Sequence, residues 1–287
     1  MARIAIIGGG SMGEALLSGL LRAGRQVKDL VVAERLPERA RYLAETYSVL
    51  LTSVQDAVEN ATFVIVAVKP SDVESVVGEA ARAAAEASDE SPEQVFITVA
   101  AGVTTGYLES KLPAGMPVVR AMPNAPALVG AGVSALAKGR FVTPEQLNGV
   151  AALFDSVGGV LCVPEAQLDA VTAVSGSGPA YFFLMVEALV DAAVGAGLSR
   201  SVATNLVVQT MAGSAAMLLE RMDQDGVAAP DASMDVTAAQ LRATVTSPGG
   251  TTAAALRELE RRGLRAAVDE AVLAAKTRSE QLRITSE

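Results

Sequence analysis

The first half of the chain alternates short apolar runs with amphipathic stretches. Runs rich in Val and Ile predict β-strands at residues 4–7, 30–33, 63–68, 95–99, 118–120 and 133–137. Helical spacing of apolar positions predicts helices at residues 14–22, 38–46 and 72–87, and the polar residues 88–92 predict an exposed loop. Because strands that are apolar throughout are buried on both faces, we expect a parallel sheet with helices on both sides.

The second half has a different pattern, since convincing strands disappear after about Cys162. Segments rich in Ala, Leu and Val predict long helices at residues 180–195, 202–221, 251–261 and 264–281, with a polar loop at 223–233. We place a boundary near Pro164, where the pattern is interrupted. The predicted fold class is an α/β Rossmann domain, residues 1–163, followed by an all-α domain, residues 164–287.

The helical half is more apolar than a surface in water normally is. The run 179–198 carries Glu187 and Asp191 one helical turn apart, which favours a buried or interface helix over a membrane span. A compact monomeric bundle would also bury such helices. We expect a homodimer or larger homo-oligomer, because small residues allow close helix packing and an interface covers apolar surface.

Charge and composition narrow the chemistry. The net charge of −9 argues against a nucleic-acid partner, which requires clustered Lys and Arg. The chain has no histidine and one cysteine, Cys162, so a Ser-His-Asp triad, a His-ligated metal and a thiolate metal cluster are all excluded. We therefore expect no metal site. The single cysteine fits a reducing, cytoplasmic compartment.

A glycine-rich loop follows the first predicted strand. Ile7 ends this strand, and the loop consists of Gly8, Gly9, Gly10, Ser11, Met12 and Gly13. Gly8 permits a tight turn, Gly10 lets the backbone approach a pyrophosphate, and Gly13 lets the following helix pack closely. Free N–H groups at the start of that helix favour phosphate. A glycine-rich turn without a ligand is the alternative, but the strand–turn–helix context favours dinucleotide binding.

The identity of the dinucleotide is left open by the end of the second strand. Glu34 lies about 20 residues after Gly13, where a carboxylate would hydrogen-bond the ribose 2′-hydroxyl of NAD. Arg35, with Arg39 nearby, could instead neutralise the 2′-phosphate of NADP. Either arginine could also be an ordinary surface charge.

Further loops follow other predicted strands, at the edge where Rossmann-type sheets bind ligands. Candidate cofactor contacts there are Ala67, Val68, Lys69, Pro70, Val99, Ala100, Ala101 and Asn124. In the helical half, residues 174–181 predict a flexible turn with a capping serine and a proline, Pro179, that suits a first helical turn. Ser247, Gly250, Thr251 and Thr252 open another helix, whose N–H groups suit a carboxylate. Simple N-capping by the threonines is the alternative.

In combination, these motifs resemble the pyrroline-5-carboxylate reductase family over nearly the full chain. The motifs are GGGSMG at 8–13, AVKP at 67–70, AAGV at 100–103, RAMPNAPALVGAG at 120–132, VSGSGPAY at 174–181 and SPGGTT at 247–252. The resemblance implies NAD(P)H-dependent reduction of 1-pyrroline-5-carboxylate to L-proline. It also implies a helical domain that dimerises, with dimers that often assemble into decamers.

The resemblance also assigns residues. It implies that the loop at 8–13 holds the pyrophosphate, that 67–70 and 99–101 flank the cofactor, and that Asn124 lies beside the ribose or nicotinamide. It further implies that Ser247, Gly250, Thr251 and Thr252 receive the substrate carboxylate, with the catalytic Thr252 hydroxyl near the ring nitrogen. Many family members have a small polar residue where this chain has Glu34. On balance we expect NADP (NADPH), with NAD (NADH) as the alternative.

Two other functions compete with this interpretation. Short-substrate Rossmann dehydrogenases such as 3-hydroxyacid or imine reductases commonly use a helix-borne lysine as acid or base. The helical half has one lysine, Lys276, far in sequence from any glycine-rich loop. A nucleotide-sensing protein without turnover is the other rival, but it would not need the carboxylate site at 247–252.

Overall fold

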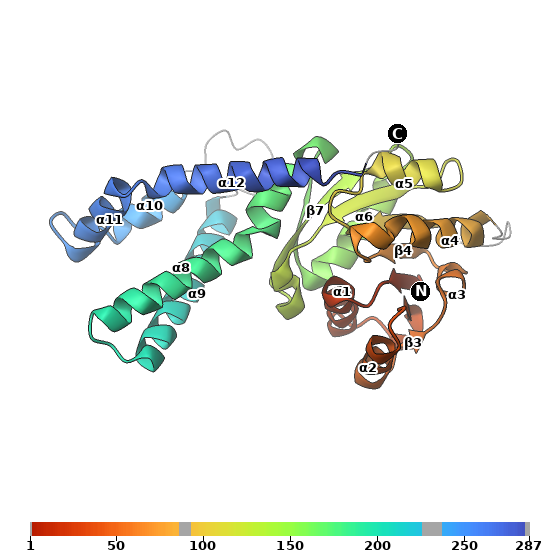
Figure 1. The fold of residues 1–287 in the computed structure, drawn as a ribbon, viewed down its shortest axis with the longest axis horizontal. Coiled ribbons are helices and arrows are strands. Elements are labelled where there is room, and N and C mark those ends of the chain that lie inside the picture. Colours follow the sequence, from red (N-terminus) through yellow and green to blue (C-terminus); the bar gives the residue numbers. More distant parts are fainter. Residues whose placement is uncertain (1, 86–92, 226–236, 285–287) are drawn as a thin grey trace. The chain divides into compact units, whose positions relative to one another are not determined.

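The computed structural model describes residues 2–85, 93–225 and 237–284. Strands between residues 4 and 162 form an eight-stranded sheet with the order β3-β2-β1-β4-β5-β6-β7-β8 (Figure 1). The strands are β1 (Ile4–Ile7), β2 (Leu30–Ala33), β3 (Leu50–Leu51), β4 (Phe63–Val66), β5 (Val95–Thr98), β6 (Val118–Met122), β7 (Gly132–Lys138) and β8 (Gly158–Cys162). All the predicted strands are confirmed. The short β3, of two residues, and the edge strand β8, which starts with two glycines, were not predicted.

Twelve α-helices occur in the described residues. Those up to residue 171 are α1 (Ser11–Arg22), α2 (Pro37–Tyr47), α3 (Val54–Val58), α4 (Val73–Ala85), α5 (Thr105–Lys111), α6 (Pro144–Phe154) and α7 (Leu168–Val171). The later ones are α8 (Gly178–Gly195), α9 (Arg200–Asp225), α10 (Thr237–Thr244), α11 (Thr251–Arg261) and α12 (Leu264–Gln281). The predicted loop at 88–92 lies outside the described residues. The loop predicted from 223 was placed too early, since α9 continues to Asp225.

The sheet is parallel with one exception. β1 pairs with β2 and β4, and β4, β5 and β6 follow in parallel register. β7 runs antiparallel to β6, so the prediction of an all-parallel sheet is wrong for this pair. The connection between them holds only the 3₁₀ turn Ala125–Val129, and a parallel return needs a longer crossover.

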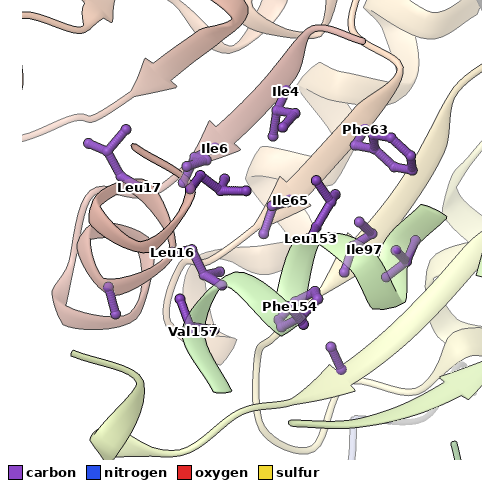
Figure 2. Close-up of a cluster of buried hydrophobic side chains, with 14 of the residues drawn as sticks. Ile4, Ile6, Leu16, Leu17, Phe63, Ile65, Ile97, Leu153, Phe154 and Val157 are labelled. Atoms are coloured by element: carbon purple, nitrogen blue, oxygen red, sulfur yellow. The ribbon is translucent and has the colours of Figure 1, made fainter. Parts of the chain in front are cut away.

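Helices cover both faces of the sheet, and a hydrophobic core lies on each. Figure 2 shows the first core, where Ile4, Ile65 and Ile97 of the sheet meet Leu16 of α1 and Phe154 of α6. The second core joins the alternate strand residues, such as Ala5 and Val64, to α3, α4 and α5. Because successive strand residues point to opposite faces, double coverage leaves the central strands buried throughout, as predicted.

The chain divides by packing into two compact units. The first contains Met1–Pro179 together with Val272–Glu287, and the second contains Ala180–Ala271. The second unit is therefore an insertion in the first, and α12 starts in one unit and ends in the other. The functional boundary near Pro164, which separates 1–163 from 164–287, stays a prediction.

The helices of the second unit expose apolar side chains. Phe182, Phe183 and Leu184 of α8 are each more than 60% exposed, and Leu219 of α9 is 63% exposed. By length and composition, Glu165–Gly195 and Arg200–Met222 would each be able to cross a membrane, with 17% and 6% of their apolar windows buried. Such helices are weak evidence for a membrane, because a subunit interface leaves the same surface on a single chain.

The segment 174–181 is not a flexible turn, so that prediction is wrong. A π-helical turn, Thr172–Gly176, links α7 to α8, and the Ser177 amide donates to the Thr172 carbonyl at 2.8 Å. Ser175 Oγ donates back to the Val171 carbonyl at 3.1 Å rather than capping α8. A π turn accommodates one extra residue inside a helix, which local sequence signals for a turn do not reveal.

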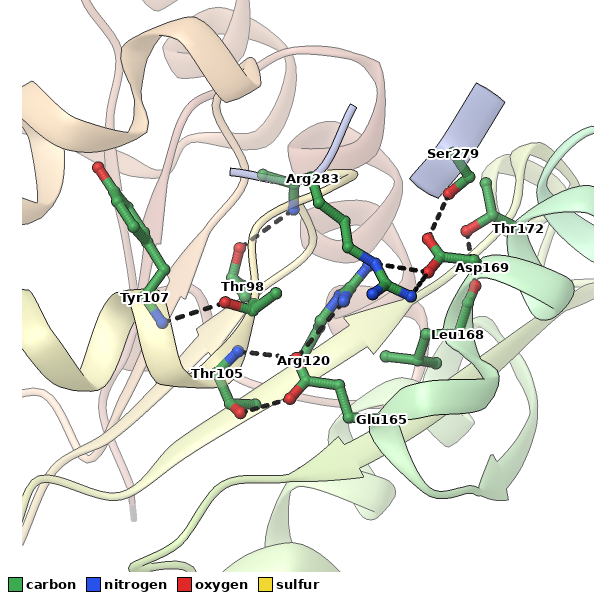
Figure 3. A network of polar contacts seen from close by, with 12 residues as sticks. Thr98, Thr105, Tyr107, Arg120, Glu165, Leu168, Asp169, Thr172, Ser279 and Arg283 are labelled. Atoms are coloured by element: carbon green, nitrogen blue, oxygen red, sulfur yellow. Dashed lines mark hydrogen bonds and ion pairs between the residues drawn. The ribbon is translucent and has the colours of Figure 1, made fainter. Parts of the chain in front are cut away.

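A buried carboxylate attaches the end of the chain to the first unit (Figure 3). Asp169 is 1% exposed, and it accepts hydrogen bonds from Ser279 Oγ at 2.7 Å and from Arg283 Nε at 2.8 Å. Burial raises the pKa of Asp169, but the hydrogen bonds from Ser279 and Arg283, with the charges of Arg283 and Arg120, outweigh it and hold this pKa below its ordinary value.

This low pKa predicts a specific acid dependence of stability. A carboxyl whose folded-state pKa is depressed stabilises the fold above its unfolded pKa, ordinarily 3.8, and the contribution is lost as pH falls through the folded pKa. The non-titrating variant Asp169→Asn lacks this contribution. We expect its deficit in free energy of unfolding to be largest near about pH 7 and to shrink below about pH 4, measured by urea unfolding. A deficit independent of pH would contradict this assignment.

Candidate active site

The loops predicted to bind the cofactor meet at one edge of the sheet. The Ala67 amide donates to the Ile7 carbonyl at 2.8 Å, and the Val99 amide donates to the Val66 carbonyl at 3.1 Å. The segments that follow β1, β4 and β5 are therefore neighbours, because the carboxyl ends of adjacent parallel strands meet at the same edge. The structure thus brings together the predicted residues at 7–13, 67–70 and 99–101.

The glycine loop is built from close backbone contacts. Gly8 has a φ of +101°, and a Cβ on it would lie 2.7 Å from the Ala67 carbonyl oxygen. A Cβ on Gly13 would overlap the Gly8 carbonyl oxygen. Both positions therefore require glycine, the first for a left-handed turn beside the next strand and the second for close packing of α1.

Gly10 differs from these two glycines, because a Cβ on it would contact no other part of the protein. A Cβ on Gly10 would have no neighbour within 4 Å. Gly10 is the exposed N-cap of α1, and no side chain caps this helix. α1 begins at Ser11, earlier than predicted, so Ser11, Met12 and Gly13 form its first turn. The first N–H groups of a helix have no partner within it, and an anion placed here receives them. This geometry fits a pyrophosphate.

Glu34 and the two arginines near it have different surroundings. Glu34 Oε2 accepts from the Gly9 amide at 2.7 Å, and Oε1 accepts from the Leu36 amide at 2.8 Å. Arg39 Nε donates to the Gly9 carbonyl at 2.7 Å, and Arg39 also pairs with Glu14. The side chain of Arg35 is 79% exposed, with Asp72 at 3.6 Å. Glu34 and Arg39 therefore hold the loop, while Arg35 faces solvent.

Glu14, which sequence analysis did not select, lies at the centre of this support. Its carboxylate accepts from Tyr47 Oη at 2.9 Å and from Tyr42 Oη at 3.1 Å, besides pairing with Arg39. Burial raises the pKa of Glu14, but these hydrogen bonds outweigh it and lower the pKa. Burial and the hydrogen bond to Glu14 raise the pKa of Tyr47 to about 12. Glu14 is an acid among apolar residues of α1, which was the available sequence signal.

The remaining cofactor candidates lie in two loops. Lys69 and Pro70 are exposed where the 3₁₀ turn Pro70–Asp72 starts, and a Cβ on Gly8 would lie 2.9 Å from a methyl of Val68. After β5, Ala100 is buried, and its amide donates to Thr98 Oγ1 at 3.2 Å. Ala100 is therefore packed inside the loop that follows β5.

Asn124 has protein partners on both ends of its amide. Its Oδ1 accepts from the Val133 amide at 2.9 Å, and its Nδ2 donates to the Ser175 carbonyl at 3.2 Å. The side chain therefore ties the turn after β6 to β7 and to the π turn. The contact of Asn124 with the ribose or nicotinamide stays a prediction. The second N–H of the Asn124 amide would make it.

The predicted carboxylate site belongs to the helical unit. Gly249 has a φ of +69°, the Gly250 amide donates to the Ser247 carbonyl at 3.0 Å, and α11 begins at Thr251 with Gly250 as its N-cap. No side chain caps this helix. Simple N-capping by Thr251 or Thr252 is therefore wrong. Thr251 is exposed and Thr252 is half-buried. Both lie in the first turn of α11, where the backbone N–H groups have no partner within the helix.

Comparison with known proteins gives a family match in each half of the chain. Residues 165–282 match the family model described as pyrroline-5-carboxylate reductase dimerisation, and residues 3–102 match the model described as NADP oxidoreductase, coenzyme F420-dependent. Pyrroline-5-carboxylate reductase of Mycobacterium tuberculosis (strain ATCC 25618 / H37Rv) is 77% identical over 100% of this chain and 99% of its own. The chain belongs to the pyrroline-5-carboxylate reductase family.

Solved structures of this reductase family have the same fold. The enzyme from Coxiella burnetii superposes with a TM-score of 0.87 at 35% identity, covering 99% of both chains. The Plasmodium falciparum pyrroline carboxylate reductase, solved with NADP bound, gives a TM-score of 0.80 at 28% identity over 98% of both chains. The chain is thus an enzyme with pyrroline-5-carboxylate reductase activity in proline biosynthesis, and its exposed helices lie within the dimerisation domain.

The glycine loop generates a paired prediction. Gly13→Ala forces a Cβ into the Gly8 backbone, and overpacking of this kind costs about 1–3 kcal/mol, so both Tm and NADPH binding should fall. Gly10→Ala has room in the protein, so Tm should change little while the Kd for NADPH rises about tenfold, because the methyl group occupies the side left open for phosphate. Calorimetry and fluorescence titration measure the two effects. Unchanged NADPH binding in Gly10→Ala would place the pyrophosphate elsewhere.

Proposed function

We propose that the enzyme reduces 1-pyrroline-5-carboxylate to L-proline with NADPH, the last step of proline biosynthesis, with the cofactor on residues 1–163 and the substrate on residues 164–287. The observation that carries this proposal is the pair of open helix N-termini. One follows the glycine loop at Gly10, and the other follows Gly249 and Gly250. The first suits a dinucleotide pyrophosphate, and the second suits a small carboxylate.

The residues at the sheet edge fit the cofactor. Gly8, Gly9 and Gly10 form the turn that follows Ile7, and Ser11, Met12 and Gly13 offer the open N–H groups of the first helical turn to the pyrophosphate. Ala67, Val68, Lys69 and Pro70 form one wall, and Val99, Ala100 and Ala101 form another. When bound, NADPH supplies a hydride to the carbon of the C=N bond. The task of the protein is then to orient the two molecules and exclude water.

The surroundings of Glu34 and Arg35 favour NADP over NAD. Both oxygens of Glu34 accept backbone N–H groups, so its carboxylate is committed to the loop rather than to a ribose hydroxyl. Arg39 is likewise engaged, with Glu14 and the Gly9 carbonyl. Arg35 is the exposed cation at this position, and a guanidinium suits a phosphate. The NADP bound by the Plasmodium falciparum relative supports the same choice.

The carboxylate of the substrate binds at the start of α11. Ser247, Gly250 and Thr251 surround the open N–H groups, and Gly250 leaves the approach free of a side chain. The half-buried Thr252 places its hydroxyl near the ring nitrogen. A protonated iminium accepts hydride more readily than a neutral imine. The chain has no histidine, so an imidazole cannot donate this proton; in this proposal the nitrogen is protonated before binding or through water, and Thr252 orients it.

The assembly extends beyond one chain. The apolar side chains exposed on α8 and α9 are covered in a homodimer, and dimers associate into a decamer. The single cysteine, Cys162, is free and exposed, which fits a reducing cytoplasm. Sedimentation of the purified enzyme measures the assembly directly.

The proposed cofactor is tested by following oxidation of NADPH and NADH with 1-pyrroline-5-carboxylate. The wild-type enzyme should have the higher kcat/KM with NADPH. Arg35→Ala should raise the KM for NADPH about tenfold and leave the KM for NADH nearly unchanged, because only NADPH carries the 2′-phosphate. Arg41→Ala, an exposed arginine on α2, is the matched control. Equal effects of Arg35→Ala on both cofactors would contradict phosphate recognition by Arg35, and no turnover with either would reject the reaction.

The role of Thr252 is tested by a pair of substitutions. Thr252→Ala removes the hydroxyl that orients the ring nitrogen, so kcat should fall about tenfold. Thr252→Ser keeps the hydroxyl and should retain most of the turnover. Steady-state kinetics with saturating NADPH measure both variants. A Thr252→Ala enzyme with the wild-type kcat and substrate KM would contradict the orienting role of Thr252.

A further inference from the structure

The last residues of the described chain lie against the loop that follows β5. The Ile284 amide donates to the Gly102 carbonyl at 2.8 Å, and Ile284 forms a parallel bridge with Val103. Gly102 has a φ of +78°, and a Cβ on it would overlap the Leu282 carbonyl oxygen. The contact therefore depends on a glycine that immediately follows Ala101.

Asp169 fixes this end of the chain. The residues before Ile284 are bound to the buried carboxylate through Ser279 and Arg283. Figure 3 shows the two side chains reaching Asp169 from the end of α12 and from the segment after it. A carboxylate buried to this extent is costly unless it is fully paired, so the network favours one position of the segment.

The far end of the same loop is held by Glu165. Its carboxylate accepts from the Thr105 amide at 2.8 Å and from Thr105 Oγ1 at 2.6 Å, at the first residue of α5. The buried guanidinium of Arg120 lies 3.4 Å from Glu165. Arg120 carries one buried nitrogen, Nη2, without a hydrogen-bond partner among the described residues. The loop after β5 is therefore held at Gly102 and Val103 by Ile284 and at Thr105 by Glu165, both distant in sequence, while its first residue, Val99, bonds to the neighbouring strand β4.

We propose that the segment 282–284, held by Asp169, positions the loop after β5 for the nicotinamide half of the cofactor. Arg283, Asp169 and the Ile284 amide are positioning residues in this proposal, and none of them contacts the cofactor. The inference rests on the proposed placement of Val99, Ala100 and Ala101 beside the cofactor. Because Gly102 directly follows these residues, a shift at Gly102 moves the cofactor wall.

The test removes one hydrogen bond and leaves the buried charges in place. Ile284→Pro lacks the amide that donates to the Gly102 carbonyl, whereas Ile284→Val keeps that amide and a branched apolar side chain. Loss of the bond should raise the Kd for NADPH about three- to tenfold, measured by fluorescence titration. The KM for 1-pyrroline-5-carboxylate should change less than about twofold. Ile284→Val should recover most of the affinity, and Thr277→Ala, on an exposed position of α12, serves as the control.

The outcomes separate this inference from the proposed function. Thermal unfolding and sedimentation establish that Ile284→Pro is folded and assembled as the wild type is. Ala101→Leu, which alters the wall directly, should weaken NADPH binding if the proposed placement is right. Weaker binding in Ala101→Leu with wild-type binding in Ile284→Pro would overturn the positioning role alone. Wild-type binding in Ala101→Leu would overturn the placement itself. Parallel losses for NADPH and imine in Ile284→Pro would show a general structural effect and also overturn the inference.

Discussion

The pairing of β1 with β2 on one side and β4 on the other determines where the loops of the cofactor site end. All three strands are parallel and are buried on both faces, so a one-residue shift of β1 would move every one of its side chains to the wrong core. The register places Ile7 beside Ala33 and Val66. The segments that follow these three strands consequently begin next to one another at the same edge of the sheet. They are the glycine loop, Glu34 and the segment from Ala67.

Two partly buried ion pairs then support this edge. Glu14 and Arg39 hold the backbone of Gly9 from α1 and α2. Asp169 and Arg283 hold the segment that contacts Gly102 and Val103. Partly buried ion pairs contribute little stability over apolar packing, but removing one partner leaves an unpaired charge. Each pair therefore acts mainly by allowing only one arrangement of the loop beside it.

Local sequence was sufficient for features whose causes are local. The alternation of apolar runs predicted the strands, and the spacing of Gly8 and Gly13 predicted contacts that the structure contains. The antiparallel direction of β7 depends on the length of its connection and on the pairing of the whole sheet, which no single run encodes. Glu34 was predicted as a ribose ligand, but its bond to the Gly9 amide depends on the pairing of β1 with β2, which brings the ends of these two strands together. Asp169 and Arg283 are 114 positions apart, so neither residue carried a signal of the other.

The insertion of residues 180–271 within the first unit has a consequence for synthesis of the protein. A chain emerging from the ribosome exposes all eight strands and Asp169 long before Ser279, Arg283 and Ile284 have been translated. N-terminal domains generally fold first during translation, but here the buried carboxylate has to wait for Ser279 and Arg283. The Rossmann unit therefore reaches its final form only after residues 279–284 have been synthesised, and a nascent chain that stops before them leaves an unpaired acid for proteolytic quality control to act on.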